Sequence, residues 1–203
     1  MDTISDLVQY CAPELPGATS GFLQNKLRGA ARQFCRETEA WTQELYEDQV
    51  ADQASYDLTP EADAYVQRII HVKTKTSSSD VFDNLSAVNP RTYELDSDGF
   101  GFTFYDSYET DYDITDGVEI KVALRPTSDA DTFTGDLFNR YGEAIYALTK
   151  SNVMRIPKKS YTDISLAMYY KGVYNDIKNV AIREKYTKNK RLDMHVNQLG
   201  GIL

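Results

Sequence analysis

Apolar residues at helical spacing mark two segments near the start of the chain. In residues 3–10, Ile4, Leu7 and Val8 fall on one face of a short helix, and the prolines that follow end it. In residues 21–45, apolar side chains recur every three or four positions: Leu23, Leu27, Ala30, Ala31, Phe34, Trp41 and Leu45. This stripe predicts a long amphipathic helix that packs against other helices.

The pattern changes between about residues 50 and 132, where Gly, Asp, Ser and Thr separate short runs rich in Val, Ile, Tyr and Phe. These runs predict strands at residues 54–58, 66–74, 91–95, 100–104 and 117–124. The pair Asp98-Gly99 joins two of them, and Asp-Gly between strand residues is a strong hairpin signal. The middle of the chain is therefore expected to form one small antiparallel sheet.

Helical spacing returns in the last third of the chain. One stripe runs through residues 137–153, and a further helix begins near Ser160 or Thr162 and continues to about residue 186. The remaining residues are first basic and then nearly uncharged, and they end in Gly-Gly-Ile-Leu. No periodicity is visible there, so the sequence predicts an extended arm.

Together these elements predict an α+β fold, because helices and strands are segregated along the chain and do not alternate. The expected architecture is an antiparallel helical bundle of about four helices with an inserted small antiparallel β-sheet subdomain and a C-terminal extended arm. The bundle is expected at residues 1–48 and 133–187, the sheet subdomain at 49–132 and the arm at 188–203. A chain of 203 residues is long enough for such a domain with an insertion.

Composition favours protein contacts over nucleic-acid binding. The chain has 15 Tyr, 8 Phe and 1 Trp, and tyrosine combines a large apolar ring with a polar tip that suits half-buried surfaces and subunit contacts. The formal net charge is −9, whereas proteins that bind the phosphates of a duplex need a basic surface. A protein of this charge repels DNA that passes close to it.

Signals for export or for a membrane are absent from the sequence. The first residues lack the basic segment and the apolar run of a signal peptide, and no stretch approaches the roughly 20 apolar residues that span a bilayer. The two cysteines, Cys11 and Cys35, form no Cys-x-x-Cys pair and are interpreted as reduced thiols. We therefore expect a soluble protein that is synthesised in a cytoplasm.

The acidic middle of the chain is the most evident candidate for chemistry. Its acids are Asp96, Asp98, Asp106, Glu109, Asp111, Asp113, Asp116 and Glu119. Asp96, Asp98 and Gly99 resemble the start of a calcium loop, but the further oxygen ligands and the closing Glu of such a loop do not follow. Three interpretations remain open: a turn with a solvated acidic rim, a metal site, and an acidic surface that acts electrostatically.

No spacing of residues selects a catalytic set. His71 falls inside a predicted strand and His195 in the predicted arm, and neither has a recognisable partner. The sequence contains no nucleophile elbow, Cys-His pair, zinc motif or glycine-rich phosphate loop. We expect no enzyme activity, no cofactor and no metal ion. A metal-dependent enzyme that uses the acidic cluster stays an alternative, because paired acids can perform general acid–base work.

Positive charge is concentrated in the last helix and the arm, at Lys171, Lys178, Arg183, Lys185, Lys188, Lys190 and Arg191. The interpretations are a nucleic-acid patch, a solvated helix end, and a surface complementary to an acidic region of a neighbouring subunit. The arm adds apolar residues and two glycines, which is typical of a segment that folds onto a partner, although a disordered tail is an alternative. The candidate partner-binding residues of the arm are Lys188, Lys190, Arg191, Leu192, His195, Val196, Leu199, Ile202 and Leu203.

Three motifs resemble the head-to-tail adaptor proteins of tailed bacteriophages. They are Leu-Arg-x-Ala-x-Arg-x-Phe-Cys-x-x-Thr-x-x-Trp at residues 27–41, Tyr-x-Leu-x-Pro at residues 56–60 and Ile-x-x-Val at residues 69–72. The motifs cover the first third of the chain, and the order of helices and strands extends the resemblance over the rest.

The resemblance implies a structural role in the neck of a virion. Such adaptors form a ring, usually of about twelve identical copies, beneath the portal protein. The C-terminal arm docks on the portal, tail proteins assemble on the ring and DNA passes through its lumen. The family implies no catalytic residues. The residues expected at the lumen or at an acidic docking face are Asp96, Asp98, Asp106, Glu109, Asp111 and Asp113. Another neck or tail-completion protein is the alternative, followed by a DNA-binding protein that uses the last helix.

Overall fold

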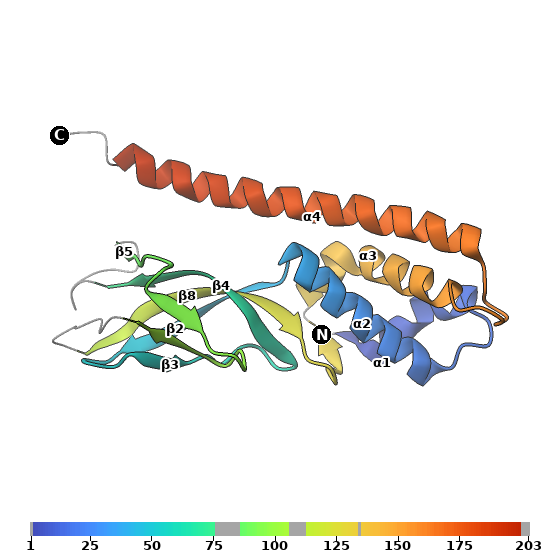
Figure 1. Cartoon of the computed structure of the whole chain (residues 1–203), viewed down its shortest axis with the longest axis horizontal. Helices are drawn as coiled ribbons and strands as arrows, with labels where there is room; N and C mark the ends of the chain where they lie inside the picture. Colours follow the sequence, from blue (N-terminus) through green and yellow to red (C-terminus); the bar gives the residue numbers. More distant parts are fainter. Residues whose placement is uncertain (1, 76–85, 106–112, 134, 200–203) are drawn as a thin grey trace. The chain divides into compact units, whose positions relative to one another are not determined.

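The computed structural model describes residues 2–75, 86–105, 113–133 and 135–199, and it describes the side chains in these ranges except those of residues 2, 86, 135, 136 and 188–199. The chain divides into two compact units, which are visible in Figure 1. One unit, called the helical unit below, comprises Met1–Ala40 and Pro126–Leu203. The other, called the sheet unit, comprises Trp41–Arg125.

The helical unit contains three long helices and a short one. They are α1 (Ile4–Leu7), α2 (Ser20–Thr38), α3 (Gly135–Met154) and α4 (Ile164–Leu199). Two 3₁₀ turns, Val8–Tyr10 and Ala12–Glu14, connect α1 toward α2. The short strand β1 (Asp2–Thr3) pairs antiparallel with β9 (Thr132–Phe133), and this ladder joins the start of the chain to the segment before α3.

Apolar side chains of the three long helices form the core of the helical unit. The stripe of α2 expected from the sequence is buried, since Leu23, Leu27 and Phe34 are each at most 1% exposed. The Phe34 ring packs against Tyr141 of α3 and Tyr174 of α4, at centroid distances of 5.1 and 6.3 Å. The prediction that this stripe serves helix packing is confirmed. Its spacing put apolar groups on one side of α2, where the other helices cover them.

Seven strands form two sheets among the described residues of the sheet unit. They are β2 (Thr42–Gln49), β3 (Ser55–Asp57), β4 (Ala64–Thr74), β5 (Ser86–Ala87), β6 (Tyr93–Leu95), β7 (Gly101–Phe104) and β8 (Ile114–Pro126). One sheet has the order β2-β8-β4-β5 and the other has the order β3-β7-β6. The strands predicted at residues 54–58, 66–74, 91–95, 100–104 and 117–124 are confirmed as β3, β4, β6, β7 and β8.

Two apolar clusters stabilise the sheet unit. Val118, Ile120 and Val122 of β8 are fully buried on one face of the central strand, while the residues between them are charged. In the smaller sheet, four aromatic rings pack together with centroid distances of 5.2 to 6.4 Å: Tyr56, Tyr93, Phe102 and Phe104. The alternation along the strands therefore separates apolar side chains on one face from charged side chains on the other.

The expectation of a helical bundle with a single inserted sheet is wrong, although the fold is α+β. The described residues form three separate sheets, of two, four and three strands. The two-stranded ladder of β1 and β9 belongs to the helical unit. Strands of two residues show no alternation, so the sequence carried no sign of this pairing. Which of the remaining strands hydrogen-bond to one another also depends on tertiary packing, which single-strand patterns do not encode.

The predicted extended arm is also wrong, because α4 continues to Leu199. Residues 188–199 contain neither Pro nor Gly and are rich in Lys, Arg, Leu, Met and Gln, which are favourable in helices. The expectation of an arm rests on the lack of a clear apolar stripe in these residues. A helix that extends past its packing partners needs no such stripe, so propensity was the better guide here.

The long helix predicted for residues 21–45 ends earlier, at Thr38. Glu39 adopts a left-handed conformation with φ of 52° and its N–H donates to the Cys35 carbonyl, which terminates α2. The next residues begin β2, and Leu45 is buried from a strand. Helical and strand spacing coincide for Trp41 and Leu45, since a separation of four fits both periods.

Candidate interaction surfaces

The Asp98-Gly99 segment is a hydrogen-bonded turn between β6 and β7. Gly99 has φ of +78° and donates its N–H to the Asp96 carbonyl at 3.0 Å, and Asp98 Oδ1 accepts from Phe100 N at 2.9 Å. A Cβ on Gly99 would lie 2.7 Å from the Val66 carbonyl oxygen, so the backbone requires glycine. Within the described part of the chain, no three Asp, Glu, His or Cys residues gather to hold a metal ion. The geometry is that of a turn.

The predicted acidic residues divide between the two sheets. Asp96 and Asp98 lie at the β6–β7 turn, whereas Asp113 precedes β8 and accepts a hydrogen bond from Ala51 N at 2.9 Å. Asp106, Glu109 and Asp111 lie outside the described residues. Two further acids, Asp48 and Asp116, are joined by a hydrogen bond, in which Asp48 Oδ1 accepts from Asp116 N at 2.8 Å. The sequence did not single out Asp48, because it lies between the helix predicted for residues 21–45 and the first predicted strand at residues 54–58, whereas the structure has β2 there.

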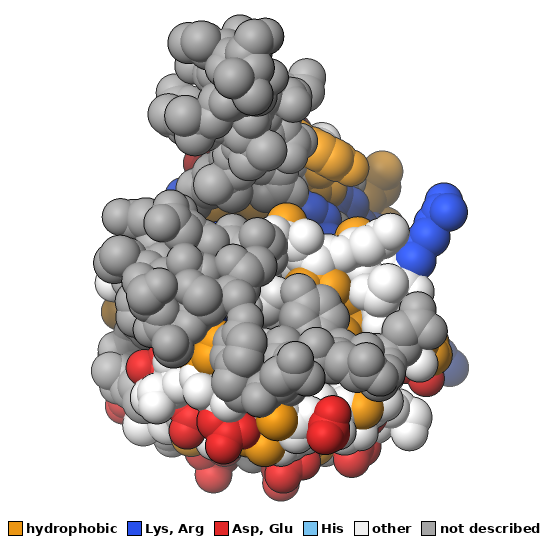
Figure 2. Space-filling view, turned by 90° about the vertical axis from the view of Figure 1, so that its left-hand side faces the viewer, with side chains coloured by type: hydrophobic (Ala, Val, Ile, Leu, Met, Phe, Trp, Pro, Cys, Tyr) orange, Lys and Arg blue, Asp and Glu red, His pale blue; other side chains and the backbone are white. Residues whose placement is uncertain are grey.

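Formal charge is divided unequally between the two units. The sheet unit has 18 acidic and six basic residues, so its formal net charge is −12. The helical unit has 13 acidic and 16 basic residues, so its formal net charge is +3. Figure 2 shows acidic side chains gathered along one side of the sheet unit. Their field acts on neighbouring groups: burial and then the charges of Asp48 and Asp57 raise the pKa of Glu47. The sheet unit therefore presents a strongly negative surface.

A row of paired charges lies across β2, β8 and β4. Lys121 donates to Glu44 at 2.8 Å, and Lys73 donates to Glu119 at 2.5 Å. His71 lies 3.4 Å from the same Glu119 oxygen. Burial lowers the pKa of His71, as do Lys73 and Lys121, and these effects outweigh Glu119, which raises it. His71 is therefore neutral at pH 7 and completes a structural cluster in the strand.

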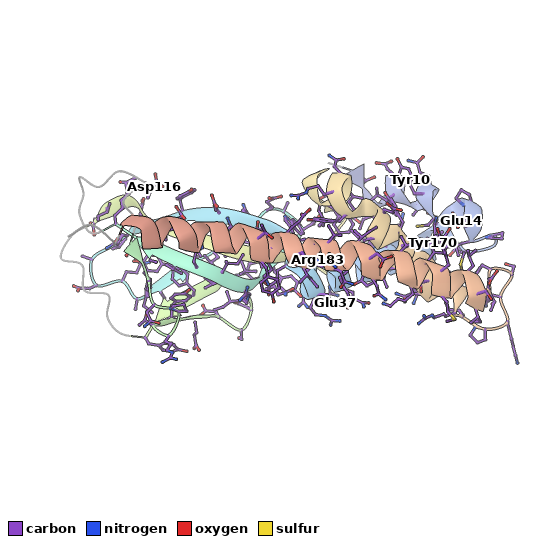
Figure 3. All side chains as sticks on the ribbon, turned by 90° about the horizontal axis from the view of Figure 1, so that it is seen from above. Tyr10, Glu14, Glu37, Asp116, Tyr170 and Arg183 are labelled. Atoms are coloured by element: carbon purple, nitrogen blue, oxygen red, sulfur yellow. The ribbon has the colours of Figure 1, made fainter. Side chains whose placement is uncertain are left out.

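Helix α4 is attached to the rest of the helical unit by glutamates. Glu14 accepts from Lys150 at 2.6 Å and from the Tyr170 hydroxyl, which lies beside it in Figure 3. Glu37 accepts from Tyr174 at 2.8 Å and forms an ion pair with Lys178 at 3.1 Å. These two sets are called the Glu14 cluster and the Glu37 cluster below.

Two more glutamates join α4 to its neighbours. Glu39 accepts from Lys185 at 2.6 Å, and Glu184 accepts from Arg140 and Tyr141, each at 2.7 Å. Burial and the carboxylate bond raise the pKa of Tyr141 to about 12, so this phenol remains a hydrogen-bond donor at all physiological pH values. Of the α4 side chains described, only Ala167, Tyr174 and Ala181 are buried. Polar bonds are therefore a large part of what holds α4 in place.

These bonds change the interpretation of the basic end of the chain. Lys178 and Lys185 are ion-paired inside the helical unit, and the Lys171 ammonium lies 4.4 Å from the centroid of the Tyr174 ring. Arg183 is exposed (Figure 3). Lys188, Lys190, Arg191, Leu192, His195, Val196 and Leu199 belong to α4, and Ile202 and Leu203 lie outside the described residues. Part of the basic cluster therefore stabilises the fold.

The two cysteines are buried free thiols. Burial raises the pKa of Cys11 to about 12, with Lys150 lowering it and Glu14 raising it to a smaller extent. A thiol with this pKa is protonated at neutral pH and is a poor nucleophile.

Comparison with protein-family models and with curated proteins finds no match to this chain. Within the described residues, no helix is both long enough and apolar enough to cross a membrane.

Proposed function

We propose that the chain is a structural virion protein, namely a head-to-tail adaptor whose identical copies form a ring between the portal and the tail in the virion neck. The observation that carries the proposal is the segregation of charge, with −12 on the sheet unit and a slightly positive helical unit. A ring around a DNA channel needs a surface that does not bind phosphates. The sheet unit has such a surface, and the resemblance of residues 27–72 to adaptors agrees with it.

The acidic surface has a direct physical effect on a passing duplex. DNA carries about one negative charge per 1.7 Å of its axis, so a negative wall raises the energy of close contact. Repulsion of this kind lets the duplex slide without being retained. The proposed role needs no catalytic residue, cofactor or metal ion.

The C-terminal part of α4 is the segment proposed to dock on the portal. Because residues 188–199 are helical, this segment would bind as a helix in a groove of the portal and not as a strand added to a sheet. Leu192, Val196 and Leu199 follow the i, i+4, i+7 spacing of such anchors. At about 1.5 Å per residue, the 36 residues of α4 span about 54 Å, which is long enough to reach a partner beyond the helical unit's own core.

The test is the mass of the protein by light scattering, alone and after mixing with a purified candidate portal ring. The expected result is a weakly associated species of low mass for the protein alone and a layer of about twelve copies on the ring. Removing residues 188–203 should abolish this binding and leave thermal unfolding unchanged. A variant with the same 16 residues in scrambled order controls for length and charge. Full binding by either variant would disprove the role of α4, and no binding by the intact chain would disprove the adaptor function.

A second candidate is a different neck or tail-completion protein in which the sheet unit makes the main contacts. Three aromatic side chains of that unit favour it, because Tyr46, Phe100 and Tyr105 are 44%, 48% and 59% exposed. Exposed aromatic residues are frequent in protein interfaces. Binding to a tail tube and not to a portal ring would distinguish this candidate from the adaptor.

A further inference from the structure

The connection between α3 and α4 carries basic groups beside exposed apolar ones. Arg155, Lys158 and Lys159 are exposed, and no ion pair to them is found among the described residues. In the first turns of α4, Ile164, Met168 and Tyr169 are 55%, 65% and 63% exposed. These six residues are called the basic patch below. Exposed apolar side chains together with charged ones are typical of a protein-binding surface.

Hydrogen bonds hold the basic patch in one conformation. The Thr162 hydroxyl donates to the Ile156 carbonyl at 2.6 Å, and Asp163 N donates to the Met154 carbonyl at 3.1 Å. The Ser160 hydroxyl donates to the Pro16 carbonyl at 2.5 Å, which ties the connection to the segment before α2. Because the backbone is constrained, binding through this patch would lose little conformational entropy.

Positive charge remains in excess around the basic patch. Burial lowers the pKa of Lys171, and the positive charges of Lys178 and Arg155 lower it further against the opposing effect of Glu37. Asp163 supplies the nearest acid in sequence, and its Oδ1 already accepts from Leu166 N at 2.9 Å as a helix cap. An approaching partner would therefore meet a net positive field.

The sheet unit has a patch of opposite charge and similar construction. Tyr46 and Val50 are 44% and 38% exposed, and Asp48, Asp113 and Asp116 are exposed around them. These five residues are called the acidic patch below. Asp48 and Asp113 accept backbone hydrogen bonds, and none of the three aspartates forms an ion pair among the described residues. Burial raises the pKa of Tyr46, and the charges of Glu119, Glu44 and Asp116 raise it further against the opposing effect of Lys73.

We infer that the basic patch of one copy binds the acidic patch of a second copy. Each patch combines an exposed apolar centre with unpaired charges, and the two have opposite sign. The two surfaces are different, so the contact is heterologous, and a heterologous contact that closes on itself generates a ring. The inference deepens the proposed adaptor function, since it names the surfaces through which the copies of that ring would meet.

The test is a double-mutant cycle on self-association, measured by sedimentation velocity at low ionic strength. The basic-patch variant is Lys158→Gln/Lys159→Gln. The acidic-patch variant is Asp48→Asn/Asp116→Asn, which keeps the oxygen that accepts from residue 116 and suits the left-handed backbone of Asp116, with φ of 49°. Each variant should weaken association about tenfold, and their combination should also weaken it about tenfold, because both remove the same contact.

Matched controls neutralise exposed charges elsewhere. Arg183→Gln and Glu94→Gln each remove one charge of the corresponding sign outside the two patches and should change association less than about twofold. A combined loss of about a hundredfold would show that the two patches bind different things, and that result overturns the inference. Equal effects of controls and patch variants, or an intact chain that stays monomeric, overturn it too. Retention of DNA by the basic patch without self-association would point to a nucleic-acid site instead.

The cycle uses the chain alone, so its outcome is separate from that of portal binding. Coupling between the patches without portal binding would remove the adaptor function and keep the inference. Portal binding with additive variants would keep the adaptor function and remove the inference.

Discussion

The helical unit and the sheet unit use the same types of residue for opposite purposes. In the helical unit, glutamates lie between helices, where Lys, Arg and Tyr side chains satisfy them, as in the Glu37 cluster. In the sheet unit, the cores are apolar and aromatic, and most of the exposed acids that the structure describes form no ion pair. The comparison shows that net charge alone does not describe a unit, because placement decides whether a carboxylate stabilises the fold or creates a field.

The largest expected effect is the loss of stability when the aromatic cluster of the sheet unit is disrupted. Phe102 is fully buried among Tyr56, Tyr93 and Phe104. Phe102→Ala should destabilise the sheet unit by about 3–5 kcal/mol, because it removes a large side chain and leaves a cavity. Trp41 lies in the sheet unit and is the only Trp in the chain, so its fluorescence during denaturant unfolding measures this loss.

The neighbouring Phe100 supplies the control for this prediction. It is 48% exposed, so Phe100→Ala should change stability by less than about 0.5 kcal/mol. An equal effect of the two substitutions would contradict the assignment of the sheet-unit core.

The Glu37 cluster offers the second largest effect. Glu37→Ala leaves the hydroxyl of the fully buried Tyr174 and the Lys178 ammonium without their acceptor, which should destabilise the helical unit by about 2 kcal/mol. Far-ultraviolet circular dichroism during denaturant unfolding would measure it. Glu143→Ala, at an exposed position of α3, should have little effect. If both variants unfold at the same denaturant concentration, α4 is not held by this carboxylate.

The pH dependence of Glu37→Ala follows from the pKa of Glu37. Burial alone would raise this pKa, but hydrogen bonds from Gln33, Tyr174 and Lys178 outweigh it and the pKa is lowered. A group whose pKa is lower in the folded state stabilises the fold above its unfolded pKa, and this contribution disappears as the pH falls through the folded value. The difference between the intact chain and Glu37→Ala should therefore shrink below about pH 4.

Glu47 of the sheet unit contrasts with Glu37 of the helical unit, because the pKa of Glu47 is raised and that of Glu37 is lowered. The folded sheet unit binds this proton more tightly than the unfolded chain does, so ionised Glu47 destabilises the unit at neutral pH. Glu47→Gln should raise the unfolding midpoint at pH 7, and the gain should vanish as the pH falls to the ordinary pKa of glutamate. The same Glu→Gln change at Glu37 should lower the midpoint. Shifts of equal sign would remove the distinction between the two units.

Divalent cations should have the smallest effect. In the Asp96–Gly99 turn, the Asp96 carbonyl and Asp98 Oδ1 already accept backbone hydrogen bonds, so millimolar Ca²⁺ or Mg²⁺ should leave the midpoint of thermal unfolding unchanged. A ligand that binds only the folded state must raise the midpoint. A clear increase with either ion that is lost in Asp98→Asn would restore the metal-dependent alternative.

Much of the secondary structure could be predicted from the sequence. The stripe of α2 and the alternation in β4 and β8 have strong periods, and the Asp98-Gly99 turn has a direct backbone cause in the positive φ of Gly99. The end of α2 was misplaced because Trp41 and Leu45 satisfy both the helical and the strand period. The helical course of residues 188–199 has no clear apolar stripe to predict it, and only the helix propensity of these residues indicates it.

The candidate surfaces were predicted only in part. The excess of acids in the middle of the chain is a property of composition, and it could be found without a structure. Other contacts join residues far apart in the chain. Asp48 accepts a hydrogen bond from Asp116, Lys178 forms an ion pair with Glu37, and Lys185 forms one with Glu39. No local pattern indicates which lysine meets which glutamate.

What the sequence determined by itself is therefore the class of each segment and the sign of its charge, because periodicity, turn chemistry and composition act over a few residues. The tertiary structure decided how the strands divide into separate sheets and which charges are paired between helices and which stay exposed. The physical reason is that hydrogen bonds and ion pairs depend on distances of about 3 Å between atoms, and only the packed chain brings distant residues that close.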